Sequence, residues 1–288
     1  MIALFDSGYG GLTVLKPIME LLPEYDYLYL GDNARAPYGN HGTDNIKKFS
    51  EQAVEYLFSR GAKLIIFACN TASSVALRHI QQKYLNGAKE TEKKILGVLI
   101  PVAEEAVEMT KNGRVGVVGT RATINSGNYT TEIHKLNPDI KVYSKACPLL
   151  VPFIEEDWHT KPEAISILKK YIKPIKSCNI DTLILGCTHY PLMIKDFKRI
   201  MGDKVKILQS GDITAKKLKD YLKKHPEIEK KLTKGKTRTF LTTDDPVKFK
   251  EFTEKHFGMR IKMPEKVALA RCFGENFVAI SSIMHARN

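Results

Sequence analysis

Short apolar runs recur along the chain of 288 residues and are typical of buried strands in a parallel sheet. Segments of helical length separate most of these runs. Strands that alternate with helices indicate an α/β fold with right-handed crossovers, in which ligands bind beyond the carboxyl ends of the strands. The expected strands cover residues 2–5, 27–30, 64–68, 95–99, 115–118, 142–144, 182–185 and 205–208.

Two of the intervening segments carry helix signals. Residues 101–113 begin with proline and end with glycine, as helices often do. Residues 42–62 repeat apolar side chains at the spacing of one helix face, and Gly61 stands where that helix would end. The repeating side chains are Ile46, Phe49, Ala53, Tyr56 and Leu57.

A weak internal repeat suggests two similar halves. One half opens with ALFDSGYGGLT and reaches IIFACNTA, and the other opens with VGVVGTRATIN and reaches LILGCTHY. In each half a hydroxyl residue, Ser7 or Thr120, follows one strand and a cysteine, Cys69 or Cys187, follows another. Two readings remain open: a chance recurrence within an α/β chain, or two similar domains that face each other with one cysteine each.

Cysteines at the ends of strands point to chemistry. A thiol between a strand and a helix lies near backbone N–H groups and the positive end of the helix dipole, which both favour the thiolate. Thr71 and Ser73 are candidates to cap the helix after Cys69. The alternative is a pair of buried, inert cysteines.

Several neighbouring polar residues are candidates for the same site. Asp6 lies in a glycine-rich turn, FDSGYGGLT, whose N–H groups could meet a carboxylate; the turn lacks the third glycine of a dinucleotide site. Of Glu155 and Glu156, one is expected to face a cleft and the other water. His189, two positions after Cys187, could exchange protons with it.

The net charge of +13 concentrates in residues 216–238. We interpret this segment as a solvated, lysine-rich face; nucleic-acid binding is a weaker alternative, because the segment has one tyrosine, Tyr221, to stack on bases. Weak steering of an anionic substrate is a third. The five cysteines form no C-x-x-C pair, and we see no signal peptide or membrane span, so we expect a cytoplasmic protein without disulfides or structural metal.

The motifs together resemble those of glutamate racemases in the aspartate/glutamate racemase superfamily. The resemblance runs in order from residue 2 to about residue 260. It rests on DSGYGGLT at residues 6–13, GD and PYG at residues 31–39, CNTA at 69–72, CPLLVPFIE at 147–155 and GCTHYP at 186–191, extended by SGD at 210–212 and FLTT at 240–243.

This resemblance implies two α/β domains with mainly parallel sheets and an active site in the cleft between them. The first domain would comprise residues 1–94 and 208–288, and the second residues 95–207. The implied reaction interconverts L- and D-glutamate without a cofactor, and D-glutamate serves peptidoglycan synthesis in bacteria. The assembly stays open between a monomer and a homodimer.

The resemblance also implies roles for individual residues. Cys69 and Cys187 match the catalytic pair; Asp6, His189 and Glu155 match assisting groups. The positions that match substrate contacts are Asp6, Ser7, Tyr38, Gly39, Asn70, Thr71, Thr120, Thr188 and His189.

Residues 264–288 extend past the usual end of the family, as a terminal helix or as a packing or oligomer element, and no role transfers to them or to Cys272. The rival enzymes are superfamily relatives that act on aspartate or hydantoins, or that decarboxylate with one cysteine. His189 after Thr188, together with the PYG motif, favours glutamate.

Overall fold

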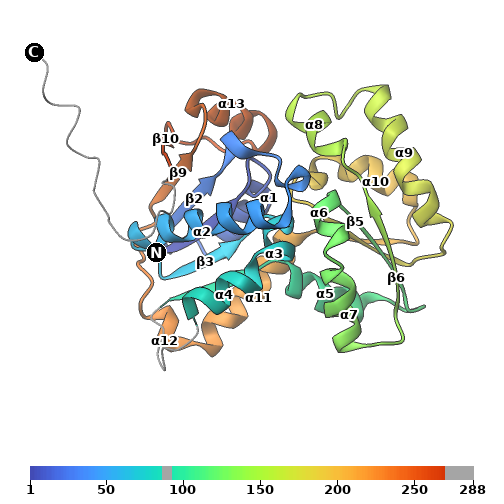
Figure 1. The fold of residues 1–288 in the computed structure, drawn as a ribbon, viewed down its shortest axis with the longest axis horizontal. Helices are drawn as coiled ribbons and strands as arrows, with labels where there is room; N and C mark the ends of the chain where they lie inside the picture. The colour runs from blue at the N-terminus through green and yellow to red at the C-terminus, as the bar shows by residue number, and fades with distance from the viewer. Residues whose placement is uncertain (86–92, 270–288) are drawn as a thin grey trace, which may run out of the picture.

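The chain forms two lobes, each built around a parallel β-sheet, in the computed structural model, which describes residues 1–85 and 93–269 (Figure 1). We name residues 1–97 and 210–269 the first lobe and residues 99–208 the second lobe. The expected fold class, α/β with mainly parallel sheets, is confirmed.

The first lobe holds a six-stranded sheet in the order β10-β9-β2-β1-β3-β4. Its early elements are β1 (Ile2–Asp6), α1 (Leu12–Leu21), β2 (Tyr27–Gly31), η1 (Asn33–Arg35), η2 (Tyr38–Asn40), α2 (Thr43–Ser59), β3 (Leu64–Phe67), α3 (Asn70–Val75), α4 (Leu77–Leu85) and β4 (Lys94–Gly97). The chain returns from the second lobe to add α11 (Ser210–Lys224), α12 (Pro226–Glu229), β9 (Arg238–Thr242), α13 (Pro246–Phe257) and β10 (Glu265–Lys266).

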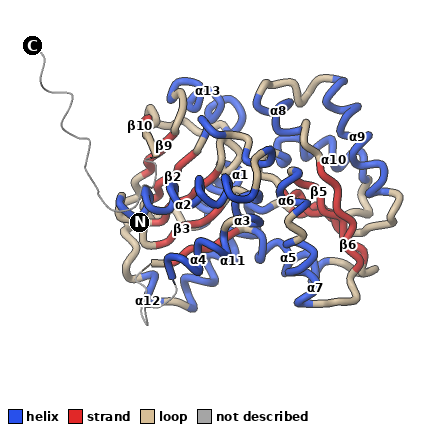
Figure 2. The backbone as a smooth tube through the Cα atoms, viewed as in Figure 1, coloured by secondary structure: helices blue, strands red, loops and turns tan. Residues whose placement is uncertain are grey.

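The second lobe holds a four-stranded sheet in the order β6-β5-β7-β8. Figure 2 shows helices on both faces of this sheet and of the first. The elements are α5 (Leu99–Met109), β5 (Arg114–Gly119), α6 (Arg121–Asn125), α7 (Asn128–Leu136), β6 (Lys141–Ala146), α8 (Leu150–Glu155), α9 (Pro162–Lys176), β7 (Thr182–Gly186), η3 (Tyr190–Met193), α10 (Ile194–Met201) and β8 (Lys206–Leu208).

Burial on both faces explains why the strands read as continuous apolar runs. In β1, Ile2 and Leu4 pack with side chains of α1, α11 and α13, whereas Ala3 and Phe5 pack with side chains of α2, α3 and α4. All four side chains are fully buried. The alternation of side chains along a strand therefore gives each face of this sheet its own apolar core.

The structure differs from the expected elements in three places. Leu99 begins α5 instead of ending a strand, because an apolar run fits a buried helix as well as a strand. Strand β9 was not expected. Residues 264–288 were expected to form a terminal helix or an added packing or oligomer element. The start of this extension instead forms strand β10, which pairs with β9 in the first sheet. Cys272 lies outside the described residues. Gly61 has a φ of 86°, as expected of a helix-ending glycine.

The sheets also locate the two chain crossings between the lobes. Strand β4 belongs to the first sheet, so that sheet extends past the expected boundary after residue 94, to Gly97. The return crossing follows β8, which belongs to the second sheet. Each crossing is a short strand-to-helix connection.

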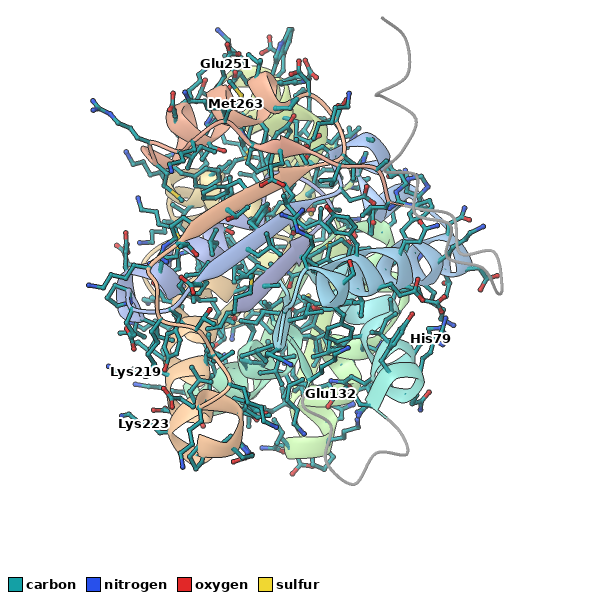
Figure 3. All side chains as sticks on the ribbon, turned by 90° about the vertical axis from the view of Figure 1, so that its left-hand side faces the viewer. His79, Glu132, Lys219, Lys223, Glu251 and Met263 are labelled. Atoms are coloured by element: carbon teal, nitrogen blue, oxygen red, sulfur yellow. The ribbon has the colours of Figure 1, made fainter. Side chains whose placement is uncertain are left out.

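The lysine-rich segment lies on the outer side of α11 and α12. Helix α11 buries Ala215, Leu218 and Leu222, while Lys216 and Lys223 are exposed. Figure 3 shows Lys219 and Lys223 on the surface of the first lobe. Among the described residues, none of the helices has the length and apolar character that crossing a bilayer requires.

Candidate active site

Both cysteines follow strands at the carboxyl edges of the two sheets. Cys69 comes two residues after β3, and Asp6 ends the neighbouring strand β1. Cys187 directly follows β7, whose last residue pairs with the last residue of β5, so Thr120 lies beside Cys187 in the register. The carboxyl edges of the two sheets face each other. The candidate site residues predicted from the sequence therefore lie close together between the lobes.

The cysteines share one small cavity, which we call the inner cavity. Its volume is about 10 Å³, which is room for about one water molecule. It is lined by Ser7, Pro37, Tyr38, Gly39, Cys69, Asn70, Thr71, Thr120, Val151, Cys187, Thr188 and His189. Every residue expected to contact substrate lines it except Asp6, and of the expected assisting groups Asp6 and Glu155 lie outside the lining.

Cys69 caps helix α3 with its own sulfur. The backbone N–H of Ala72 donates to Cys69 Sγ at 3.4 Å, and the thiol lies 3.5 Å from Ser7 Oγ. Burial and the nearby Asp6 carboxylate raise the pKa of the Cys69 thiol to about 12, although the Ala72 N–H and Ser7 oppose this. Cys69 therefore favours the protonated thiol in this structure.

The expected capping by Thr71 and Ser73 is wrong, because both lie inside α3 and bond elsewhere. Thr71 Oγ1 is 2.9 Å from Thr120 Oγ1 in the other lobe. Ser73 Oγ donates to the carbonyl of Phe67 at 2.8 Å. The hydroxyl of Thr71 therefore links the lobes instead of ending the helix.

Cys187, His189 and Glu155 form a chain of polar contacts in the second lobe. Cys187 Sγ lies 4.0 Å from His189 Nδ1, and His189 Nε2 lies 2.9 Å from Glu155 Oε1. Burial alone lowers the pKa of His189, but Cys187 and Glu155 outweigh it and hold that pKa well above its usual value. Both contacts therefore favour the protonated form of His189. Glu156 is exposed, whereas Glu155 is partly buried against His189.

Asp6 is fully buried behind the cavity wall and holds the lobes together. Thr188 Oγ1 donates to Asp6 Oδ1 at 3.3 Å, and the Gly8 N–H donates to Asp6 Oδ2 at 2.9 Å. Burial raises the pKa of Asp6, while the charge of His189 and these donors lower it. The Asp6 carboxyl group therefore contacts the second lobe through Thr188, and its negative charge raises the pKa of the Cys69 thiol.

Two glycines allow the lobes to approach. A Cβ on Gly10 would lie 2.4 Å from Thr188 Oγ1 and 2.5 Å from His189 Nδ1. A Cβ on Gly39 would lie 2.4 Å from Thr120 Cβ. Both contacts join the two lobes, so a side chain at either glycine would keep the lobes from packing this closely.

Tyr38 and Asn70 also line the inner cavity and have hydrogen-bond partners, except at one atom of Asn70. Tyr38 donates its hydroxyl proton to Asp32, which also accepts from Arg35 Nε at 2.7 Å. Tyr129 donates to Asn70 Oδ1 at 2.6 Å. Asn70 Nδ2 is buried and has no hydrogen-bond partner in the described part of the chain.

Sequence reasoning missed two lining residues. Pro37 and Val151 complete the wall of the inner cavity. Each lies inside a motif that was recognised, PYG and CPLLVPFIE, but neither carries a reactive group that would single it out. In residues 1–85 and 93–269 no three His, Cys, Asp or Glu side chains gather as metal ligands.

Comparison with known proteins gives the class. The model of the family "Asp/Glu/Hydantoin racemase" matches residues 14–218. A glutamate racemase from Corynebacterium diphtheriae is 38% identical over 269 residues, covering 93% of this chain and 97% of the relative. The chain therefore belongs to the Asp/Glu/hydantoin racemase family, and the racemase expected from the motifs is confirmed.

Solved structures agree with this assignment. The glutamate racemase isoform RacE1 from Bacillus anthracis superposes with a TM-score of 0.85 at 35% identity, covering 93% of this chain and 97% of that one. A glutamate racemase from Francisella tularensis in complex with D-glutamate has a TM-score of 0.83 at 36% identity, with the same coverage. Within the family, this chain thus matches glutamate racemases along nearly its whole length.

Proposed function

We propose that the inner cavity interconverts L- and D-glutamate without a cofactor, with Cys69 and Cys187 as the acid–base pair. The observation that carries this proposal is that the two thiols reach one cavity from opposite lobes. Inversion of a carbon requires removal of a proton on one face and delivery on the other. Thiols can serve as acid or base near neutral pH once their surroundings adjust the pKa.

The groups behind the cysteines support this division of labour. Asp6 acts on Cys69, whose pKa it raises. His189, held by Glu155, lies within reach of Cys187 for proton exchange. In either direction one cysteine removes the α-proton as thiolate and the other returns a proton as thiol.

Substrate contacts are proposed at the lining residues and at Asp6. The unpartnered Asn70 Nδ2 can donate to a carboxylate, and leaving it unpaired in a buried site is costly. Ser7, Thr71, Thr120 and Thr188 offer hydroxyl groups. Tyr38, Gly39 and His189 complete the set. Because the inner cavity holds about one water molecule, the lobes must part before glutamate binds.

The biological role follows from the product. We propose that D-glutamate formed here supplies peptidoglycan synthesis. A reaction that depends on reduced thiols suits the cytoplasm, where we place this enzyme; the four described cysteines are all free.

Incubation of L-glutamate with exhaustively dialysed protein is expected to yield D-glutamate, measured by chiral chromatography. Addition of pyridoxal phosphate, metal or nucleotide is expected to change nothing, because the chain's own thiols move the proton. Activity restored only by pyridoxal phosphate would refute the proposal. Faster racemisation of L-aspartate than of L-glutamate would reassign the substrate.

The variant Glu155→Gln is expected to shift the high-pH limb of the pH profile of kcat/KM to lower pH by about one unit. Glu155 raises the pKa of His189, so removing the carboxylate lowers that pKa. His189 then loses its proton, and with it the charged partner of Cys187, at a lower pH.

The matched control is Glu156→Gln, which removes the adjacent, exposed carboxylate. Its pH profile should coincide with that of the wild type. An unshifted limb in Glu155→Gln, or an equal shift in both variants, would contradict the assigned contact between Glu155 and His189.

A further inference from the structure

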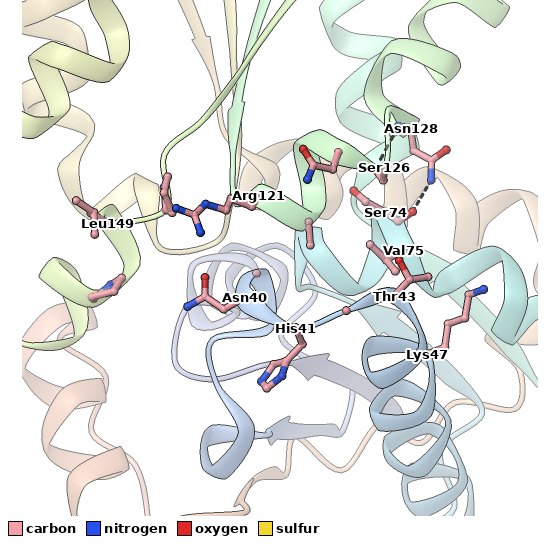
Figure 4. Close-up of a pocket in the computed structure, with 16 residues that line it drawn as sticks. Asn40, His41, Thr43, Lys47, Ser74, Val75, Arg121, Ser126, Asn128 and Leu149 are labelled. Carbon is pink, nitrogen blue, oxygen red and sulfur yellow. Dashed lines mark hydrogen bonds between the residues drawn. The ribbon is translucent and has the colours of Figure 1, made fainter.

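A larger cavity adjoins the inner one, and we call it the outer cavity. It has a volume of about 740 Å³ and opens to solvent between the lobes (Figure 4). It is lined by Gly39, Asn40, His41, Gly42, Thr43, Lys47, Ser74, Val75, Arg121, Ala122, Asn125, Ser126, Asn128, Pro148, Leu149 and Pro152. Its walls are η2 and the start of α2, the end of α3, α6 with the start of α7, and the start of α8.

The charges on this lining have one sign. Lys47 and Arg121 are cations, and no aspartate or glutamate is among the lining residues. In residues 1–85 and 93–269 neither Lys47 nor Arg121 forms a side-chain hydrogen bond or an ion pair. Asp44, one residue after Thr43, is the nearest acid along α2 and lies outside the lining. The outer cavity therefore favours anions.

Uncharged groups on the lining add to this preference. Helix α2 begins at Thr43 with Gly42 as an N-cap that supplies no side-chain hydrogen bond, and both residues line the cavity, which places the positive end of the helix dipole at its wall. Ser74 is 3% exposed, and its Oγ is buried without a hydrogen-bond partner in the described part of the chain. This hydroxyl is a donor that a ligand in the cavity could satisfy.

The outer cavity and the inner cavity meet at Gly39. Gly39 lines both cavities, and its Cα packs against the side chain of Thr120. Arg121 follows Thr120 directly, at the start of α6. Figure 4 shows the Arg121 side chain extending over the space above Asn40 and His41. Parting of Gly39 from Thr120 would join the cavities and leave Arg121 beside the opening.

We propose that the outer cavity is an anion-collecting antechamber through which substrate reaches the two cysteines, and that Arg121 is its main positioning cation. The proposal rests on the proposed function only for the identity of the substrate, a dicarboxylate amino acid. Lys47 and the N-terminus of α2 add positive electrostatic potential on another wall of the outer cavity. The lysines of residues 216–238 do not line the cavity, and interactions between exposed charges fade over a screening length.

Alkylation of the cysteines tests the route without relying on turnover. Iodoacetate is an anion and iodoacetamide is neutral, and the same thiolate attacks both and displaces iodide. The ratio of their rates at Cys69 and Cys187, mapped by peptide mass spectrometry, therefore cancels the thiolate fraction and reports how charge affects access. Cys178 is half-buried and lies outside both cavities, so it serves as an internal reference.

The variants are Arg121→Glu, Arg121→Gln and Lys47→Glu, with Lys216→Glu as a control of equal charge change on the exposed face of α11. At about 10 mM ionic strength the ratio should fall about fivefold or more in Arg121→Glu, less in Arg121→Gln and Lys47→Glu, and not in Lys216→Glu. At about 1 M salt, where the screening length is about 3 Å, the variants should converge on the wild type. The ratio at Cys178 should stay constant throughout.

An unchanged ratio in the Arg121 and Lys47 variants overturns the proposal, as does an equal fall in Lys216→Glu, which would assign the effect to net charge. Failure of both reagents to reach either cysteine also overturns it. Circular dichroism confirms that each variant is folded, and Lys47→Glu carries the test if Arg121→Glu does not fold. If the alkylation ratio depends on Arg121 but the protein does not racemise glutamate, the antechamber proposal stands and the proposed function is rejected. If the protein racemises glutamate but the ratio is unchanged in the variants, the proposed function stands and the antechamber proposal is rejected.

Discussion

Replacing either Cys69 or Cys187 by alanine is expected to lower racemisation of glutamate by about 10³-fold or more, because general acid–base assistance contributes about 10²–10⁴-fold and both proton transfers depend on the pair. In deuterated water, early product of the wild-type reaction should carry deuterium at the α-carbon while recovered substrate carries almost none. Circular dichroism follows the reaction, and mass spectrometry follows the label.

Each alanine variant should still exchange the α-proton of one enantiomer through the surviving thiol, and the enantiomer that exchanges should differ between the two variants. The matched control is Cys178→Ala, which removes a free thiol that does not line the inner cavity and should leave turnover within about twofold, as most changes away from a site do. If Cys69→Ala or Cys187→Ala kept racemising, one cysteine would leave the proposed mechanism.

Adding one methyl group at Gly39 is expected to lower kcat/KM by about 10²-fold, a loss of the size that a misplacement of about 1 Å can cause. The new Cβ would stand 2.4 Å from Thr120 Cβ, an atom fixed to the backbone of the other lobe, so the lobes could not close as they do here. The melting temperature should change little, because the clash lies between the lobes and not in either core. Kinetics and thermal unfolding of Gly39→Ala measure the two effects.

Gly42→Ala is the matched control, three residues along the same loop. A Cβ at Gly42 meets nothing within 4 Å, so the lobes can close and kcat at saturating substrate should stay near that of the wild type, although Gly42 lines the outer cavity. A Gly39→Ala enzyme with normal kcat/KM would show that the Gly39–Thr120 contact does not form during catalysis. A large fall in melting temperature would show that the methyl group disturbs the first lobe itself.

The strands that were predictable are those buried on both faces. Strand β1 is fully buried and reads as an unbroken apolar run. Strand β9 escaped because Arg238 and Thr239 are polar and only its last three residues are buried, next to a long lysine-rich stretch. Local pattern also failed at Leu99, where an apolar run changes from strand to helix without a break in composition.

The candidate site was predictable as far as chemistry resides in motifs. Cys69 and Cys187 stand out because a reactive side chain follows an apolar run. The contacts between the lobes were not predictable, because they join residues far apart in the chain. Gly10 against His189 and Thr71 against Thr120 depend on how two sheets approach, which no local pattern encodes.

The separation of Cys69 and Cys187 onto different lobes lets activity and stability evolve apart. One apolar core belongs to the first lobe alone and another to the second lobe alone, while a third cluster contains buried residues of both lobes. Polar contacts such as that between the hydroxyl groups of Thr71 and Thr120 also join the lobes beside the two thiols. Substitutions in the two cores that are confined to one lobe should therefore mainly affect stability. Substitutions at the polar contacts between the lobes should change turnover with little effect on thermal stability. Evolutionary changes in catalytic rate are therefore expected mainly at these contacts.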